Sequence, residues 1–144
     1  MTLHLDHDAF WGPDVAYWEP AISLSDRWCL QALVSPGDVE WARQWLWCHT
    51  YGSGSRLLGS NAQKCYNKIY ARRCTRIGGV AKTIFLHREI TERAYGPPPS
   101  PLHVSDHLDG DSLNCRRDNL RWATLSQNAH NRFGSYWLQH RFDL

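Results

Sequence analysis

The last third of this 144-residue chain holds the feature that most constrains its fold. PLHVSDHL (101–108) and NLRWAT (119–124) are two short stretches of strand-forming residues, and the polar loop DGDSLNCRRD separates them. Thr124 and Gln127 then form a T-x-x-Q capping box, which predicts that a helix begins at Leu125. We therefore expect strand, loop, strand and helix in this order, within a small α+β domain.

Shorter elements are expected before this unit. The stretch 21–34 predicts a short hairpin, and the turn SPGD ends in Asp38, a residue suited to cap a helix over 39–47. The stretch 84–96 begins like a strand and continues with helical spacing, up to a C-capping Gly96 that precedes several prolines. Short strands and helices thus lead into the C-terminal unit.

Length and composition suit a single domain. We expect residues 1–20 to form an acidic, aromatic N-terminal arm and residues 21–144 to form the domain itself. No apolar run is long enough to cross a membrane, and the N-terminus lacks the pattern of a signal peptide. A cytoplasmic protein with no membrane partner is the resulting expectation.

Charge is distributed unevenly along the chain. Residues 1–40 contain one basic and seven acidic residues, whereas residues 41–144 contain fifteen Lys/Arg and seven acids, a net charge of +8. Such an asymmetry is typical of a polyanionic partner such as DNA, although chance clustering would give the same count.

One segment concentrates cations and aromatic rings. If residues 64–73 form a strand, alternation places five such side chains on one face: Lys64, Tyr66, Lys68, Tyr70 and Arg72. A face of this kind can contact the phosphates and sugars of DNA. A solvated strand face with edge-packed aromatics is an equally weighted alternative.

The five cysteines favour neither disulfides nor zinc. Their number is odd and no CxxC pair occurs. Cys48, His49, Cys65 and Cys74 supply four possible ligands, but their spacing matches no common zinc pattern. Buried free thiols are the preferred interpretation, and a structural zinc ion is not expected.

The acid–histidine cluster SDHLDG (105–110) admits three interpretations: a turn, a calcium loop or a catalytic metal site. Neither calcium-loop register works, because apolar residues occupy ligand positions and no Glu stands at the twelfth. A catalytic site is chemically reasonable, since His107 suits a general base near neutral pH and Asp106 suits a hard cation. Asn128, in the first turn of the following helix, could add a carbonyl oxygen.

The stretch 102–132 carries a family resemblance. Its Asp-His pair, the following Asp-Gly, the Asn-Leu-Arg strand and the Thr-x-x-Gln-Asn helix start resemble the core of HNH endonucleases, especially the phage and intron-encoded homing type. The three motif positions fall on His107, Asn119 and Asn128, and LHREI (86–90) is similar to an element that often precedes this core. Asparagine at the third position corresponds to the HNN variant.

The resemblance implies a ββα-metal fold over about residues 101–133 and hydrolysis of DNA phosphodiesters. On this interpretation His107 is the general base for water, and Asn119 shapes the loop and helps to orient His107. Asp106 and Asn128 would bind one divalent metal, Mg²⁺ first and Mn²⁺ second. Four arginines around the site are candidate clamps for the DNA backbone: Arg116, Arg117, Arg121 and Arg132.

Other polar residues receive structural interpretations. Asp106 alone would favour a simple turn, and only the downstream pattern reverses that preference. His87 is expected to be a hydrogen-bonded scaffold residue, and no chemistry is expected from His103. His130 and Asn131 are expected either to contact backbone phosphate or to be solvated.

Two functional hypotheses remain open. The first is an active endonuclease, a monomer or homodimer that nicks or fully cleaves DNA. The second is a DNA-binding protein without turnover on the same scaffold. The presence of Asp106, His107 and Asn128 together favours the first, while a role in homing, defence or packaging cannot be chosen from the sequence.

Overall fold

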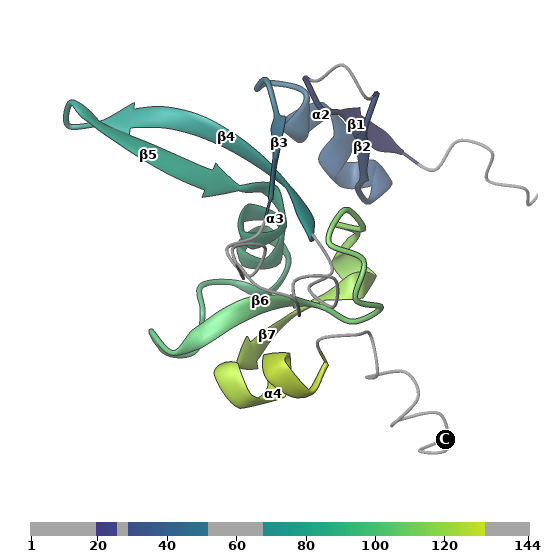
Figure 1. Cartoon of the computed structure of the whole chain (residues 1–144), viewed down its shortest axis with the longest axis vertical. Coiled ribbons are helices and arrows are strands. Elements are labelled where there is room, and N and C mark those ends of the chain that lie inside the picture. Colours follow the sequence, from purple (N-terminus) through teal and green to yellow (C-terminus); the bar gives the residue numbers. More distant parts are fainter. Residues whose placement is uncertain (1–19, 26–28, 52–67, 132–144) are drawn as a thin grey trace, which may run out of the picture.

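The computed structural model describes residues 20–25, 29–51 and 68–131. The expected N-terminal arm, Lys64, Tyr66, Cys65 and Arg132 lie outside these ranges. The described elements confirm the α+β class, with three small sheets and three α-helices (Figure 1). No helix among the described residues is long and apolar enough to span a membrane.

The first part of the chain forms a hairpin and a three-stranded sheet. Strands β1 (Ala21–Ser23) and β2 (Gln31–Leu33) pair antiparallel, which confirms the hairpin expected over 21–34. Strand β4 (Ile69–Ile77) pairs antiparallel with both β3 (Cys48–Tyr51) and β5 (Val80–Phe85). The β4–β5 turn consists of two glycines with positive φ, a conformation that side chains disfavour.

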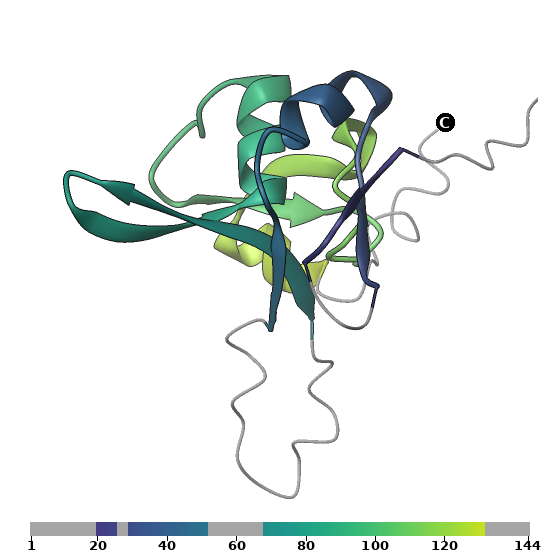
Figure 2. The ribbon, with the colours of Figure 1, turned by 90° about the horizontal axis from the view of Figure 1, so that it is seen from above.

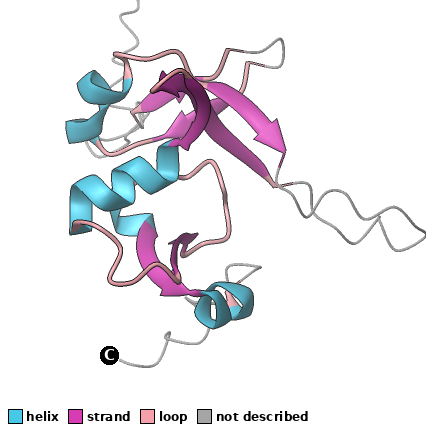
Figure 3. Cartoon of the chain, turned by 90° about the vertical axis from the view of Figure 1, so that its left-hand side faces the viewer, coloured by secondary structure: helices cyan, strands magenta, loops and turns pink. Residues whose placement is uncertain are grey.

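Helix α3 (Leu86–Tyr95) lies between the three-stranded sheet and the C-terminal unit (Figure 3). It begins directly after β5 and ends at Gly96, whose φ of 80° suits the C-cap position predicted for it. Its buried residues Leu86 and Ile90 join a core that also includes Ile22, Trp47 and Leu120. The core therefore joins segments from both ends of the described chain.

The C-terminal unit has the predicted order of two strands and a helix. Strands β6 (His103–His107) and β7 (Leu120–Thr124) pair antiparallel, and α4 (Leu125–His130) follows β7 at once. Thr124 and Gln127 form both hydrogen bonds of the capping box. A short 3-10 helix, η4 (Arg117–Asn119), precedes β7, so this strand starts one residue later than expected.

The helix expected over 39–47 is shorter than predicted. Helix α2 covers only Val39–Ala42, after the 3-10 helix η1 (Pro36–Asp38). The chain leaves the helix because Trp47 enters the core, where its indole N–H donates to the Ala42 carbonyl at 2.8 Å. Trp41 and Trp45 still meet as predicted, with ring centroids 5.2 Å apart.

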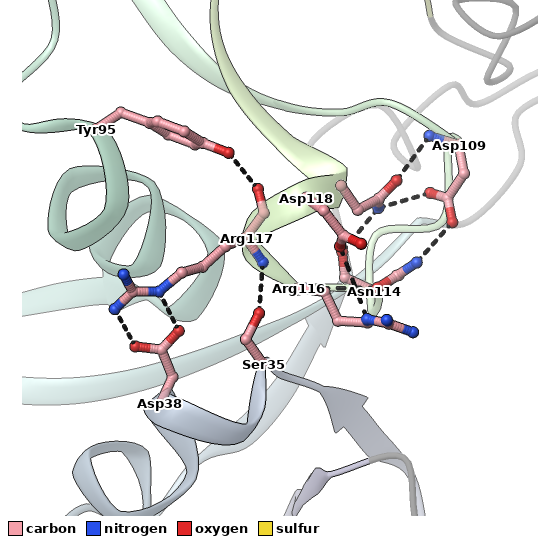
Figure 4. Close-up of polar contacts among 9 residues, drawn as sticks. Ser35, Asp38, Tyr95, Asp109, Asn114, Arg116, Arg117 and Asp118 are labelled. Atoms are coloured by element: carbon pink, nitrogen blue, oxygen red, sulfur yellow. Dashed lines mark hydrogen bonds and ion pairs between the residues drawn. The ribbon is translucent and has the colours of Figure 1, made fainter. Parts of the chain in front are cut away.

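Asp38 does not cap α2, contrary to the sequence-based prediction. Its side chain makes no capping hydrogen bond and is fully buried. Both carboxylate oxygens instead accept hydrogen bonds from Arg117 at 2.7 Å (Figure 4). Arg93 Nε also approaches Oδ1, at 3.4 Å. These bonds hold the pKa of Asp38 below its ordinary value, although burial opposes them. Asp38 therefore links η1 to η4 and α3.

Candidate active site

Three elements meet around His107. This residue ends β6, Tyr70 comes from β4, and His87 lies in the first turn of α3. The imidazole ring of His107 lies 4.8 Å from that of His87 and 6.1 Å from the ring of Tyr70, between centroids. Tyr70 and His87 also contact each other and Phe85. His107 is thus supported by an aromatic cluster.

Hydroxyl groups fix β6 against α3 beside this cluster. Ser105 of β6 lies 2.5 Å from the Thr91 hydroxyl of α3 and donates a longer, 3.4 Å hydrogen bond to the His87 carbonyl. Thr91 donates to the same carbonyl at 2.7 Å. These bonds keep the end of β6, and with it His107, in contact with the first turn of α3.

The imidazole of His107 is uncharged at neutral pH. Only 6% of the residue is exposed, and this burial, assisted by the positive charge of Lys68, lowers the pKa of its imidazole to about 3. Its Nε2 has no hydrogen-bond partner among the described residues. A neutral imidazole retains one nitrogen able to accept a proton, which is what general-base chemistry requires.

Asp106 lies beside His107 in a network of nitrogen donors. Its Oδ2 accepts hydrogen bonds from Arg121 Nε at 3.0 Å and from Asn131 Nδ2 at 3.1 Å. Arg121 Nη2 is also 3.0 Å from Oδ2. Burial raises the pKa of Asp106 above its ordinary value, while the bonds from Arg121 and Asn131 act in the opposite direction.

Asn119 lies on the other side of the β6–β7 loop. Its amide nitrogen donates to Asp109 Oδ1 at 2.8 Å and to the Asn114 carbonyl at 2.9 Å, while its oxygen accepts the Asp109 N–H. The Asn114 amide donates to the second oxygen of Asp109 (Figure 4). Gly110, with a φ of 78°, completes the turn. Asn119 therefore holds the loop that directly follows His107.

Asn128 lies apart from this hydrogen-bond network. It is half-buried in α4, a helix that contacts both β6 and β7, and its side chain makes no hydrogen bond within the described part of the chain. The same part contains no group of three or more His, Cys, Asp or Glu side chains able to hold a metal.

The candidate arginines divide by their contacts. Arg117 forms a double hydrogen bond with buried Asp38, which gives it a structural role, while its expected DNA contact stays a prediction. Arg121 points at Asp106, opposite which it lies in the β6–β7 register. Arg116 is 3.7 Å from the exposed Asp118 and stays near the surface. The side chains of Arg116 and Arg117 are 38% and 40% exposed and that of Arg121 is 26% exposed, so all three stay candidates for a phosphate contact.

For two residues at the site, the structure differs from the sequence-based prediction. His87 is no hydrogen-bonded scaffold histidine, because its Nδ1 has no partner among the described residues and its ring contacts His107. Asn131 is 3% exposed and bonds Asp106, so it is neither solvated nor available to phosphate. The spacing of three from Asn128 to Asn131 was a usable signal, since residues so spaced share one side of a helix.

Comparison with known proteins agrees with this geometry. Residues 85–130 match the family model described as HNH endonuclease, a segment of about one third of the chain that ends with α4. The resemblance inferred from the DH, DG and Asn-Leu-Arg elements is therefore confirmed for this segment, and it indicates a nuclease that acts on nucleic acid. No curated protein and no solved structure gives a significant match.

Proposed function

We propose that the protein is a metal-dependent DNA endonuclease in which His107 activates the attacking water. The observation that carries this proposal is the position of His107, neutral and at the very end of β6, beside Asp106 and within the HNH match. A neutral imidazole near a phosphodiester can accept the proton of water while the water oxygen attacks phosphorus.

The residues present fit a divalent cation bound through oxygen. Among the described residues, Asp106 Oδ1 accepts one long hydrogen bond, 3.3 Å from Asn131, so this oxygen retains lone-pair capacity that Oδ2 lacks. Asn128 would supply an amide oxygen. Two such ligands completed by substrate phosphate oxygens suit Mg²⁺, with Mn²⁺ as an alternative. The bound ion would stabilise negative charge on the phosphoryl group.

The neighbouring residues support this chemistry without entering it. Asn119 holds the loop after His107, and Tyr70 keeps its phenolic proton because burial and the charge of Asp106 raise its pKa. The ring contacts of Tyr70 and His87 hold the His107 ring in place. The protein thus supplies a fixed base next to a fixed carboxylate.

A plasmid assay tests the proposal against a DNA-binding protein without turnover. Supercoiled plasmid incubated with the protein and Mg²⁺ or Mn²⁺ should convert to open circles, and EDTA should stop the conversion. Open circles alone indicate a monomer with one site, whereas early linear product indicates a homodimer that cuts both strands. If the plasmid stays intact with both Mg²⁺ and Mn²⁺ while the protein still shifts DNA in a gel, the protein binds DNA without cleaving it.

The DNA-facing surface is proposed to continue from the site along β4. Alternation places Lys68, Tyr70 and Arg72 on one face, and the contact of Tyr70 with His107 shows which side of the sheet this is. Lys64 and Tyr66 lie outside the described residues. The charge of Lys68 also acts on both Asp106 and His107. A phosphate at His107 would therefore be near Lys68.

The far half of the β4–β5 hairpin extends this surface away from the core (Figure 2). Between Ile69 and Phe85 the chain carries four basic residues and no acidic one: Arg72, Arg73, Arg76 and Lys82. Arg73 is bound to Glu89, but Arg76 and Lys82 are exposed. Arg76 shares the face of Arg72, whereas Lys82 pairs with Thr75 and so lies on the other face of the ribbon. A two-stranded ribbon is narrow enough to enter the major groove of DNA, and its charge matches that of the backbone.

Replacing both hairpin cations should weaken DNA binding in a salt-dependent way. We expect Arg76→Ala with Lys82→Ala to reduce the slope of log K against log [salt] by about 1 for each lost phosphate contact. From Tyr70 to Ile77 a strand spans roughly 23 Å, which corresponds to about 7 base pairs of DNA. In a footprinting experiment, the double variant should therefore fail to protect the DNA backbone from hydroxyl radicals within about 7 base pairs of the nick. Arg43→Ala is the matched control, because Arg43 is exposed but lies beside α2 and pairs with Glu40. Equal slopes for all three proteins would remove the hairpin from the DNA interface.

A further inference from the structure

Asn131 joins the two central residues of the site through one amide group. The residue directly follows α4 and is almost fully buried. Its Nδ2 donates to the backbone carbonyl of His107 at 2.9 Å and to the Asp106 carboxylate, at 3.1 Å from Oδ2 and 3.3 Å from Oδ1. An amide nitrogen carries two hydrogens, so one N–H serves the carbonyl and the other serves the carboxylate.

These hydrogen bonds lie at the end of β6, where two adjacent residues must both face the site. Adjacent residues on a regular strand point to opposite faces, so Asp106 and His107 can serve one substrate only where β6 ends. Asn131 holds the carbonyl at that end and the carboxylate of the preceding residue at the same time. It thereby fixes the angle between the strand terminus and the Asp106 side chain.

Asn131 also limits how far the Asp106 carboxylate can rotate toward Arg121. Two nitrogens of Arg121 lie 3.0 Å from Oδ2, and a carboxylate held only by this cation would be free to rotate toward the guanidinium and accept with both oxygens. The shared N–H of Asn131 keeps Oδ1 turned away from Arg121. Oδ1 is the oxygen with the fewest hydrogen bonds and so the one available to a cation.

We propose that Asn131 is a positioning residue that orients the Asp106 carboxylate and the terminus of β6 for metal binding and cleavage. This inference rests on the proposed nuclease function. Asn128 in α4 and Asn131 directly after it then have different roles on the same side of the helix. Asn128 offers an amide oxygen to the metal, while Asn131 acts only through Asp106 and His107.

Two substitutions test the role of the amide. Asn131→Leu removes both N–H donors while keeping the number of side-chain heavy atoms, and Asn131→Ser retains one hydroxyl donor. We expect Asn131→Leu to lower the nicking rate constant and the Mn²⁺ affinity by about 10- to 100-fold, the usual effect of losing a partner of a metal ligand. Asn131→Ser should recover part of both losses. DNA affinity in EDTA, and with it the KM for plasmid, should change little.

The measurements are single-turnover nicking, Mn²⁺ titration followed by electron paramagnetic resonance, and thermal unfolding of each variant. Ser126→Ala is the matched control, since Ser126 is exposed on the same helix. Wild-type nicking rates and Mn²⁺ affinity in folded Asn131→Leu would overturn the proposal; if that variant does not fold, the same result in Asn131→Ser would overturn it. If the wild-type protein does not nick DNA, the proposed function fails, and the Mn²⁺ titration alone decides the role of Asn131.

Discussion

His107→Ala is expected to abolish most plasmid nicking while DNA binding persists. Removing a general base typically lowers a rate by roughly 10²- to 10⁴-fold. The aromatic cluster that surrounds His107 retains Tyr70, Phe85 and His87, which still contact one another. Because the cations proposed to contact phosphate are also unchanged, the effect should appear in the rate constant and not in DNA affinity. Single-turnover nicking and a gel shift in EDTA measure the two quantities separately.

His103→Ala provides the matched control for this experiment. His103 lies at the other end of the same strand, where its Nδ1 is 2.8 Å from the Ser100 hydroxyl and far along β6 from His107. We expect its nicking rate to stay near that of the wild type. Residual nicking by His107→Ala then sets the upper limit for contaminating nuclease, because both variants share one purification. Near-normal nicking by His107→Ala would remove this residue from the role of base.

Trp47→Ala is expected to give the largest loss of stability. The indole is fully buried, donates to the Ala42 carbonyl, and packs beside the rings of Trp41 and Trp45, with centroids 6.5 and 6.4 Å away. Truncating such a side chain costs about 3–5 kcal/mol of unfolding free energy, through lost burial and the cavity that remains. This is a large share of the roughly 5–15 kcal/mol that holds a typical domain folded. Urea unfolding followed by circular dichroism measures the change.

Leu46→Ala is the control for the core substitution. Leu46 precedes Trp47 but is 74% exposed, so its truncation should change the unfolding free energy by less than about 0.5 kcal/mol. A similar loss in both variants would mean that Trp47 contributes no more than a surface residue. That result would contradict the placement of Trp47 at the centre of the core.

The ββα unit was predictable from sequence because its signals are local. Thr124 and Gln127 lie three residues apart and form the predicted capping box. The polar loop and Gly110 define a turn that must join two strands, and alternation then fixes where β6 ends. Gly96 ends α3 as predicted for the same reason, since a glycine C-cap depends only on the preceding helix.

The hydrogen-bond partners of the residues in and around the site were not predictable, because they depend on contacts between distant segments. Asp38 has the residue type and position of a helix cap, and only the approach of Arg117 from 79 positions away turns it into a buried ion pair. Asn131 bonds Asp106 only once α4 packs against β6. The contact of Arg121 with Asp106 would have been predictable had the β6–β7 register been known, since the two residues lie directly opposite each other.

His87 shows a further limit of local interpretation. In sequence it lies among apolar residues, which favours a buried scaffold histidine with a satisfied ring. The structure places its ring against His107, because β6 docks on the first turn of α3 through Ser105 and Thr91. Only the pairing of these two elements reveals that the histidines are neighbours.

The contacts between the two ends of the described chain bear on how small an active fragment can be. Leu33 exchanges backbone hydrogen bonds with Leu113 and Cys115, and the Ser35 hydroxyl accepts the Arg117 N–H at 2.9 Å. A fragment trimmed to residues 85–130 would therefore lose the support of the β6–β7 loop from outside. It would also leave the Arg117 guanidinium without Asp38 and expose Leu86 and Ile90 to water. We infer that the shortest autonomously folding version of this protein begins no later than β1, even though its HNH segment begins some sixty residues further on.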